Sequence, residues 1–276
     1  MRTIYAADPV RFQRMTTAEI RDSFLLDSLF TPGVIELLYS NIDRVVVGSA
    51  VPTDGALELS TADELRAEYF AQRRELGVLN LGGEGTITVD GVAYPMANRD
   101  GLYVGRGSRQ IRFESADART PAAYYLVSYP AHTTYPTTQA RQADAEAVHL
   151  GSDKDANRRT IYKYIHPAGI PSCQLVMGFT ELAPGSVWNT MPAHLHPRRM
   201  EVYLYFNLPE AHRVFHLMGP PDETRHIVVA DRQAVLSPSW SIHSGCGTSN
   251  YCFCWGMGGE NQDFDDMDPT DTDDLR

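Results

Sequence analysis

The chain has 276 residues, 43% of them hydrophobic and 21% charged, which is enough to bury one large core or two smaller ones. Its formal net charge is −11, and Lys and Arg do not cluster along the sequence, which argues against a nucleic-acid partner. No stretch approaches the roughly 18 apolar residues of a membrane span, and the first residues lack a signal-peptide core, so we expect a cytoplasmic protein without a membrane partner.

Helix is expected in two short segments near the amino-terminal end. Residues 16–26 open with Thr-Thr-Ala-Glu, which is a helix-capping pattern. Thr61 and Glu64 have the same capping-box spacing at the start of residues 62–69. Neither segment carries residues that suggest chemistry.

Short runs of alternating or β-branched residues dominate the rest of the chain, and Gly, Pro, Asn and Asp separate them. Examples are DRVVVGSAV, GTITVDGVAYPM, YYLVSYP, EVYLYFNL and YCFCWGMGG. Many short strands with turn residues about every 8 to 12 positions are typical of a β-sandwich or barrel. We therefore predict an all-β protein with few short helices.

The two halves of the sequence repeat each other. RRELGVLNL in the first half resembles RRMEVYLYF in the second, and GLYVGRGSRQ aligns without gaps on AVLSPSWSIH. We predict an amino-terminal barrel over residues 1–130 and a carboxy-terminal barrel over residues 161–276, which ends in an acidic, solvated or subunit-contacting tail from Glu260. Residues 131–160, rich in Pro, Thr, Asp and Ala, are predicted to be a linker.

Four residues of the second half form a candidate metal site. His194 and His196 alternate, so on a strand their imidazoles point to the same face. Glu201 begins the next predicted strand, and His243 follows a turn that contains Pro. Three imidazoles and a carboxylate suit zinc, manganese, iron, cobalt or nickel. We predict one divalent ion per chain, with zinc preferred because it has no redox chemistry.

This spacing resembles the two-part motif of cupins: His-x-His, four residues, Glu, and a distant His. The resemblance implies that each half is a double-stranded β-helix, or jelly-roll. The same spacings in the first half put Glu68, Phe70, Glu75 and Gln110 at the ligand positions. Only the Glu is retained, so we predict that the amino-terminal barrel binds no metal. Glu75 would then be a structural carboxylate, paired with Arg73 or Arg74.

Longer stretches carry a closer resemblance. YSNIDRVVVG, RRELGVLNLGGEGTITVDG, TELAPGSVWNTMPAHLHPRRMEVYLYFN and QAVLSPSWSIHSG, among others, span nearly the whole chain. They resemble the 5-keto-4-deoxyuronate isomerase family, also called 4-deoxy-L-threo-5-hexosulose-uronate ketol-isomerases. The resemblance implies that the four candidate ligands hold the metal and that the chain converts 5-dehydro-4-deoxy-D-glucuronate to 3-deoxy-D-glycero-2,5-hexodiulosonate in pectin and uronate degradation. It also implies a homo-oligomer, namely a hexamer.

Candidate catalytic residues follow from strand alternation. Counted from Glu201, Tyr203 and Tyr205 also face the barrel interior, where each could relay a proton, hydrogen-bond the sugar or pack in the core. A bidentate Arg would hold the substrate carboxylate, and we favour Arg199, which shares the parity of Glu201. The other candidates for this role are Arg159, Arg198 and Arg225.

Two alternative functions stay open at this point. An Fe(II) cupin dioxygenase would use the same three His and one Glu, with open positions for oxygen. A non-catalytic cupin that binds sugar acids is the second alternative, although the sequence contains no evident output segment such as a helix-turn-helix.

Overall fold

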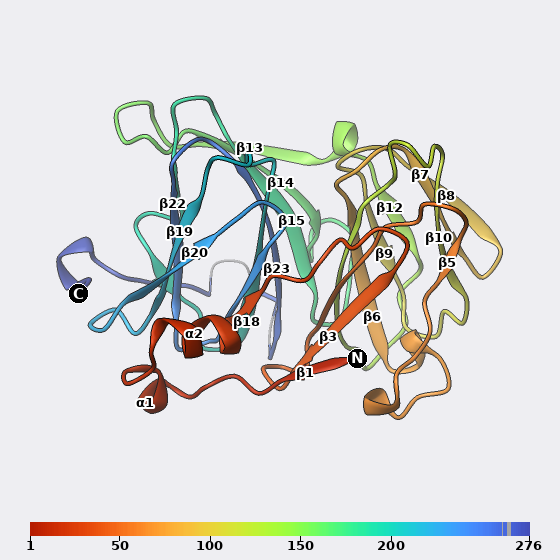
Figure 1. Ribbon diagram of the computed structural model, residues 1–276, viewed down its shortest axis with the longest axis horizontal. Coiled ribbons are helices and arrows are strands. Elements are labelled where there is room, and N and C mark those ends of the chain that lie inside the picture. Colours follow the sequence, from red (N-terminus) through yellow and green to blue (C-terminus); the bar gives the residue numbers. More distant parts are fainter. Residues whose placement is uncertain (261, 264–265) are drawn as a thin grey trace. The chain divides into compact units, whose positions relative to one another are not determined.

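The computed structural model describes residues 1–260, 262–263 and 266–276, and it divides the chain into two compact units (Figure 1). The first unit consists of Met1–Ile4, Ser28–Ala145 and Tyr164–Val176. The second unit consists of Tyr5–Asp27, Glu146–Lys163 and Met177–Arg276.

The first unit contains two sheets. In spatial order, the seven-stranded sheet consists of β1 (Arg2–Ile4), β3 (Ile35–Ser40), β4 (Val46–Ala50), β11 (Tyr124–Pro130), β6 (Arg74–Asn80), β9 (Gly101–Val104) and β12 (Thr138–Ala140). The four-stranded sheet consists of β5 (Leu57–Glu58), β10 (Ile111–Ser115), β7 (Gly85–Val89) and β8 (Val92–Met96).

The second unit repeats this pair of sheets. Its seven-stranded sheet consists of β13 (Glu146–Leu150), β14 (Arg159–Ile165), β15 (Val176–Leu182), β23 (Cys252–Gly259), β18 (Arg199–Phe206), β21 (Ala234–Ser237) and β2 (Leu25–Leu26). Its four-stranded sheet consists of β16 (Trp188–Asn189), β22 (Ile242–Gly247), β19 (Val214–Gly219) and β20 (Arg225–Val229). A small additional sheet pairs β17 (His194–Leu195) with β24 (Asp268–Pro269).

The strand orders of the two units are equivalent. The order β3-β4-β11-β6-β9 of the first large sheet recurs as β14-β15-β23-β18-β21, and β5-β10-β7-β8 recurs as β16-β22-β19-β20. In both units, the chain passes repeatedly between the two sheets, as it does in a jelly-roll. The predicted all-β fold of duplicated cupin barrels is confirmed.

Helix is scarce in the part of the chain that the structure describes. It comprises α1 (Pro9–Phe12), α2 (Thr17–Phe24) and four 3-10 turns, η1 (Asp63–Leu65), η2 (Phe70–Gln72), η3 (Gln142–Asp144) and η4 (Thr272–Asp274). α2 has the predicted capping box, in which the Glu19 carboxylate accepts from the Thr16 backbone N–H at 2.8 Å. The predicted helix over residues 62–69 is wrong, because Arg66 adopts φ +48° and ends η1. None of these helices is long and apolar enough to cross a membrane.

Two segments differ from the predicted domain boundaries. Residues 5–27, which include α1 and α2, belong to the second unit (Figure 1). There the buried rings of Phe12 and Phe24 pack edge-on against Trp240. Residues 131–160, predicted to be a linker without strands, contribute β12 to one large sheet and β13 to the other. The polar composition of this segment hid its strands, because β13 is held by backbone pairing with β14 along its whole length and not by an apolar pattern.

The interior of the first unit is apolar, and Leu76 of β6 belongs to it. Since side chains alternate along a strand, Glu75 faces the opposite side. Leu76 pairs with Val104, the last residue of β9. Glu201 pairs in the same way with Ser237, the last residue of β21, which is the equivalent strand of the second unit. The interpretation that Glu75 is the retained ligand position is therefore wrong, because Leu76 occupies that position.

Glu75 is nevertheless a structural carboxylate. It is fully buried, and its oxygens accept from the backbone N–H groups of residues 173–175 at 2.7, 2.7 and 2.8 Å. The Tyr103 hydroxyl donates to the same carboxylate at 2.8 Å. The expected pairing with Arg73 or Arg74 is wrong, since both guanidinium groups donate to other acceptors. Backbone donors, not a cation, stabilise this buried charge.

Candidate metal centre

The four predicted ligands meet inside the second barrel. His194 lies in β17 and His196 directly follows that strand, while Glu201 and His243 lie in β18 and β22 of the two facing sheets. One donor atom from each residue lies within 4.8 Å of the other three. Within residues 1–260, 262–263 and 266–276, no other group of His, Cys, Asp and Glu is assembled in this way.

The donor atoms converge on one point. Nε2 of His196 and Nε2 of His243 lie 2.9 and 3.0 Å from Oε2 of Glu201. Nε2 of His243 also lies 3.0 Å from Nε2 of His194. Three imidazole nitrogens gathered with one carboxylate oxygen form the donor set expected around a transition-metal ion.

Neighbouring groups orient two of the rings from behind. Nδ1 of His196 lies 3.1 Å from the Arg199 carbonyl, and Nδ1 of His243 lies 3.5 Å from the Ser237 hydroxyl. A hydrogen bond from Nδ1 to an oxygen fixes the tautomer that leaves the Nε2 lone pair free for a metal. Strand β18 thus contributes the candidate ligand Glu201 and, through the Arg199 carbonyl, orients the candidate ligand His196.

Burial sets the protonation of the donors. It lowers the pKa of His194 to about 3 and also lowers the pKa of His243, so both imidazoles are neutral near pH 7. Burial raises the pKa of Glu201, but the proximity of His243 and His196 outweighs it, so the net pKa lies below the ordinary value. Neutral imidazole and ionised carboxylate are the forms that bind metals. The cluster can therefore hold a metal ion.

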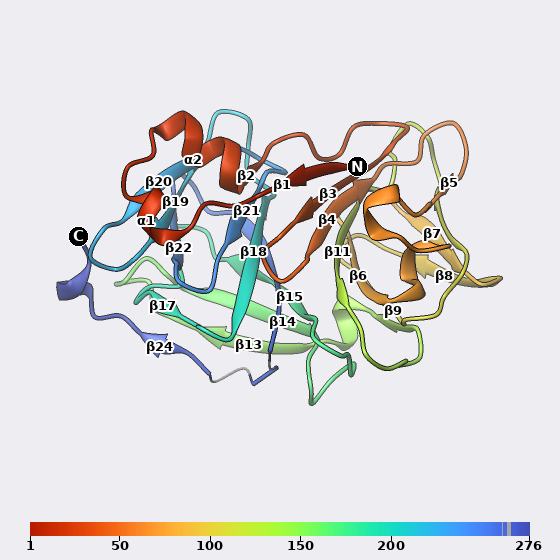
Figure 2. The same cartoon turned by 90° about the horizontal axis from the view of Figure 1, so that it is seen from below.

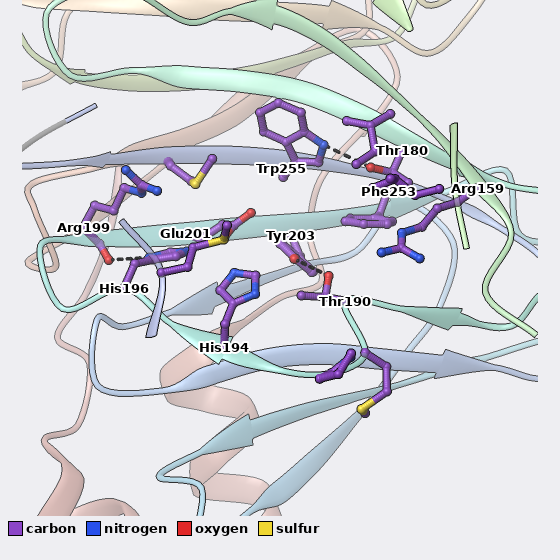
Figure 3. Close-up of a pocket in the computed structure, with 16 residues that line it drawn as sticks. Arg159, Thr180, Thr190, His194, His196, Arg199, Glu201, Tyr203, Phe253 and Trp255 are labelled. Atoms are coloured by element: carbon purple, nitrogen blue, oxygen red, sulfur yellow. Dashed lines mark hydrogen bonds and ion pairs between the residues drawn. The ribbon is translucent and has the colours of Figure 1, made fainter. Parts of the chain in front are cut away.

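The cluster borders a pocket of about 270 Å³ (Figure 3). Apolar side chains form much of its wall, among them Ile161, Phe253, Trp255 and Met257. The Trp255 indole N–H donates to the Thr180 hydroxyl at 3.1 Å, which fixes the indole in the wall. An apolar enclosure with a few polar groups is typical of a small-molecule site.

The two candidate tyrosines have different positions. Tyr203 lines the pocket, and its hydroxyl lies 2.9 Å from the hydroxyl of Thr190, whose backbone adopts a left-handed φ of 41°. Tyr205 is fully buried outside the pocket wall, and its hydroxyl lies 2.7 Å from Nδ1 of His216. Burial raises the pKa of both tyrosines, so both phenols are protonated near pH 7.

The four candidate arginines also separate. Arg198 and Arg225 form ion pairs with Glu260 and Glu223 and do not line the pocket. Arg199 lines the pocket and is almost fully buried, and its guanidinium donates to a backbone carbonyl, that of Asp263. Arg159, at the start of β14, also lines the pocket.

The acidic carboxy-terminal segment contributes to the site, which the sequence analysis did not predict. β24 pairs with β17, the strand that carries His194 (Figure 2). Met267, just before β24, lines the pocket. The many Asp residues of this segment suggested a solvated tail. The strand was missed because β24 is very short and pairs with β17, which lies far away in the sequence. Thr190 was missed for a similar reason, because only the strained loop before β17 brings its hydroxyl to Tyr203.

Two cupin barrels, one of which gathers three imidazoles and a carboxylate, define the class of protein as a duplicated cupin with a candidate metal centre. The KduI/IolB family matches residues 29–273, and the chain belongs to that family. A 4-deoxy-L-threo-5-hexosulose-uronate ketol-isomerase of Lachnoclostridium phytofermentans is 57% identical over 98% of both chains. Relatives of the same name from Shouchella clausii (54%, 99% of both chains) and Caldicellulosiruptor bescii (52%, 100% of both chains) are similarly close.

These relatives confirm the prediction of an enzyme of the ketol-isomerase class. Solved structures agree on the fold. An IolB-like protein from Salmonella typhimurium superposes with a TM-score of 0.69 at 14% identity, over 90% of this chain and 96% of its own. An oxalate decarboxylase of Bacillus subtilis has a TM-score of 0.55 at 10% identity, over 78% of this chain and 69% of its own. At such identities the likeness concerns the fold alone.

Proposed function

We propose that the chain is a metal-dependent isomerase that converts 5-dehydro-4-deoxy-D-glucuronate to 3-deoxy-D-glycero-2,5-hexodiulosonate. The observation that carries this proposal is the cluster of His194, His196, Glu201 and His243 beside an enclosed pocket that also contains hydroxyl and guanidinium groups. The substrate named by relatives more than 50% identical over nearly the whole chain supports it.

The reaction moves a carbonyl from C1 to C2. A proton leaves C2 and a proton arrives at C1, while the hydroxyl proton of C2 moves to the C1 oxygen, so no oxidant is consumed. The negative charge of the enediolate that forms in between must be stabilised, and a divalent ion held by His194, His196, Glu201 and His243 would supply this as a Lewis acid. We propose zinc, one ion per chain, because three nitrogens and one oxygen suit it; the other divalent transition metals take the same donors.

Tyr203 and Thr190 are the hydroxyl groups best placed to act on the sugar. Because its pKa is raised, Tyr203 stays a phenol, which can donate to a sugar oxygen and pass a proton between O1 and O2 but is a poor base toward carbon. We assign Tyr205 a supporting role in the core, since its hydroxyl is held by His216. The Arg199 carbonyl positions the ring of His196.

The remaining parts of the proposal concern context. We propose that the reaction belongs to pectin and uronate degradation, as the family resemblance implies. The four free cysteines suit a reducing compartment, which supports the cytoplasm. The same resemblance supports a homo-oligomer, a hexamer, and light scattering on the eluted protein would measure its mass.

The test is to incubate the metal-loaded protein with the uronate under nitrogen and in air, while NMR follows the C1 aldehyde. We expect the aldehyde to disappear and the C2 ketose to appear at equal rates under both gases, with no oxygen uptake. Turnover that requires oxygen would instead indicate a cupin dioxygenase. Binding without turnover would indicate a sugar-acid-binding cupin.

A further inference from the structure

Of the two arginines that line the pocket, Arg159 points its guanidinium into the pocket (Figure 3). Figure 3 shows its guanidinium pointing toward the hydroxyl groups of Thr190 and Tyr203, and in that view His194 lies on the other side of these hydroxyls. The pocket therefore presents, in sequence, the candidate metal ligands, a pair of hydroxyls and a guanidinium.

The charge of Arg159 lacks a counterion in the part of the chain that the structure describes. One of its N–H groups donates to the Asn157 carbonyl at 2.9 Å, and no Asp or Glu forms an ion pair with it. Burial lowers its pKa. A partly desolvated guanidinium with unused donors is stabilised when an anion enters beside it.

Arg199 is occupied in a different way. Its carbonyl orients His196, and its guanidinium donates to the Asp263 carbonyl, so the residue is tied to the backbone on both counts. Its place at the start of β18, two residues before Glu201, puts it at the metal end of the pocket. A substrate whose C1 and C2 lie at that end has its C6 carboxylate at the opposite end.

We propose that Arg159 binds the substrate carboxylate and thereby selects sugar acids over neutral sugars. This inference rests on the proposed function and replaces the sequence-based preference for Arg199. The planar guanidinium matches a carboxylate through two parallel N–H···O hydrogen bonds, and apolar side chains such as Trp255 and Met257 line the same pocket.

The test compares the uronate with its uncharged methyl ester in four variants: Arg159→Gln, Arg159→Lys, Arg158→Gln and Arg199→Gln. Arg159→Gln should lower kcat/KM for the uronate by about 100-fold and change that for the ester far less, so that the preference for the acid disappears. Arg159→Lys, which keeps the charge but not the fork, should lie in between. Arg158→Gln is the matched control, because that side chain is 54% exposed and pairs with Asp153.

Two results would overturn the proposal: equal losses for acid and ester in Arg159→Gln, or loss of the acid preference in Arg199→Gln but not in Arg159→Gln. Calorimetry separates this proposal from the proposed function. If the wild type binds the uronate without isomerising it, the proposed function fails, whereas the role of Arg159 still requires Arg159→Gln to lose that binding by about 100-fold. Unchanged binding by the variant would refute that role alone.

Discussion

The interiors of the two barrels share one topology but differ in chemistry. In the first barrel Gly85 pairs with Ser115, and at the matching place in the second barrel Val214 pairs with Gly247. Four residues before Ser115 and Gly247 lie Ile111 and His243, so Ile111 occupies the position of His243. By the same reasoning Leu76 occupies the position of Glu201. The first barrel fills these positions with an apolar core and the second with candidate metal ligands. A few inward positions can therefore change a barrel from a packing unit into a reaction site without a change of strand order.

The largest expected effect comes from removing a ligand. His243→Ala should abolish metal retention and lower turnover by more than the roughly 10- to 100-fold typical of a lost supporting residue, because one of four donors is gone. The matched Ile111→Ala in the first barrel should instead destabilise the fold by about 2–5 kcal/mol and leave the metal content unchanged. Elemental analysis and urea unfolding measure the two quantities. A metal-replete His243→Ala protein would break the comparison.

Glu75→Gln tests the claim that the first barrel uses its buried carboxylate for stability. An amide cannot accept as strongly from three backbone N–H groups and the Tyr103 hydroxyl, so we expect a loss of about 2–4 kcal/mol in unfolding free energy. Glu84→Gln, at an exposed position of the same unit, should change it by less than about 0.5 kcal/mol. Lost metal with unchanged stability in Glu75→Gln would refute this division of roles.

The polar interior should also make the second barrel sensitive to acid. Burial lowers the pKa of His216 from 6.5 to about 3, so the folded state binds fewer protons than the unfolded state between these values. Stability from this neutral imidazole is fully present above about pH 6.5 and falls by about 1.4 kcal/mol per pH unit below it. The unfolding free energy of His216→Gln should therefore fall less steeply with decreasing pH than that of the wild type, by about 1.4 kcal/mol per pH unit. Urea titrations from pH 6.5 to 4.5 would measure both slopes. An identical slope in the variant would assign the acid sensitivity to other groups.

Much of the contrast between the two barrels could be predicted from the sequence, because it depends on the local spacing of residues. Strand alternation and turn residues predicted the barrels, and the spacing of His-x-His, a later Glu and a distant His predicted the four candidate ligands. Register across the repeat was less accessible. Glu75 and Gln110 were each aligned one residue away from the inward positions that Leu76 and Ile111 occupy, and a slip of one residue exchanges the two faces of a strand.

Contacts between distant segments could not be predicted from local patterns. The pairing of β24 with β17 depends on two very short strands, in a segment whose many Asp residues favour exposure. The orientation of Arg159 depends on how β14 enters its sheet, whereas the parity argument only favoured Arg199. Tertiary placement thus decided which of several chemically equivalent residues reaches the pocket.

The central claim is that one metal ion in the second barrel enables the isomerisation. Its most direct test is to strip the protein with a chelator, add zinc in steps and measure bound metal and uronate turnover on the same samples. We predict that the stripped protein is inactive and that activity rises in proportion to bound zinc until one ion per chain is reached. Full activity in the stripped protein, or saturation only at two ions per chain, would contradict the claim.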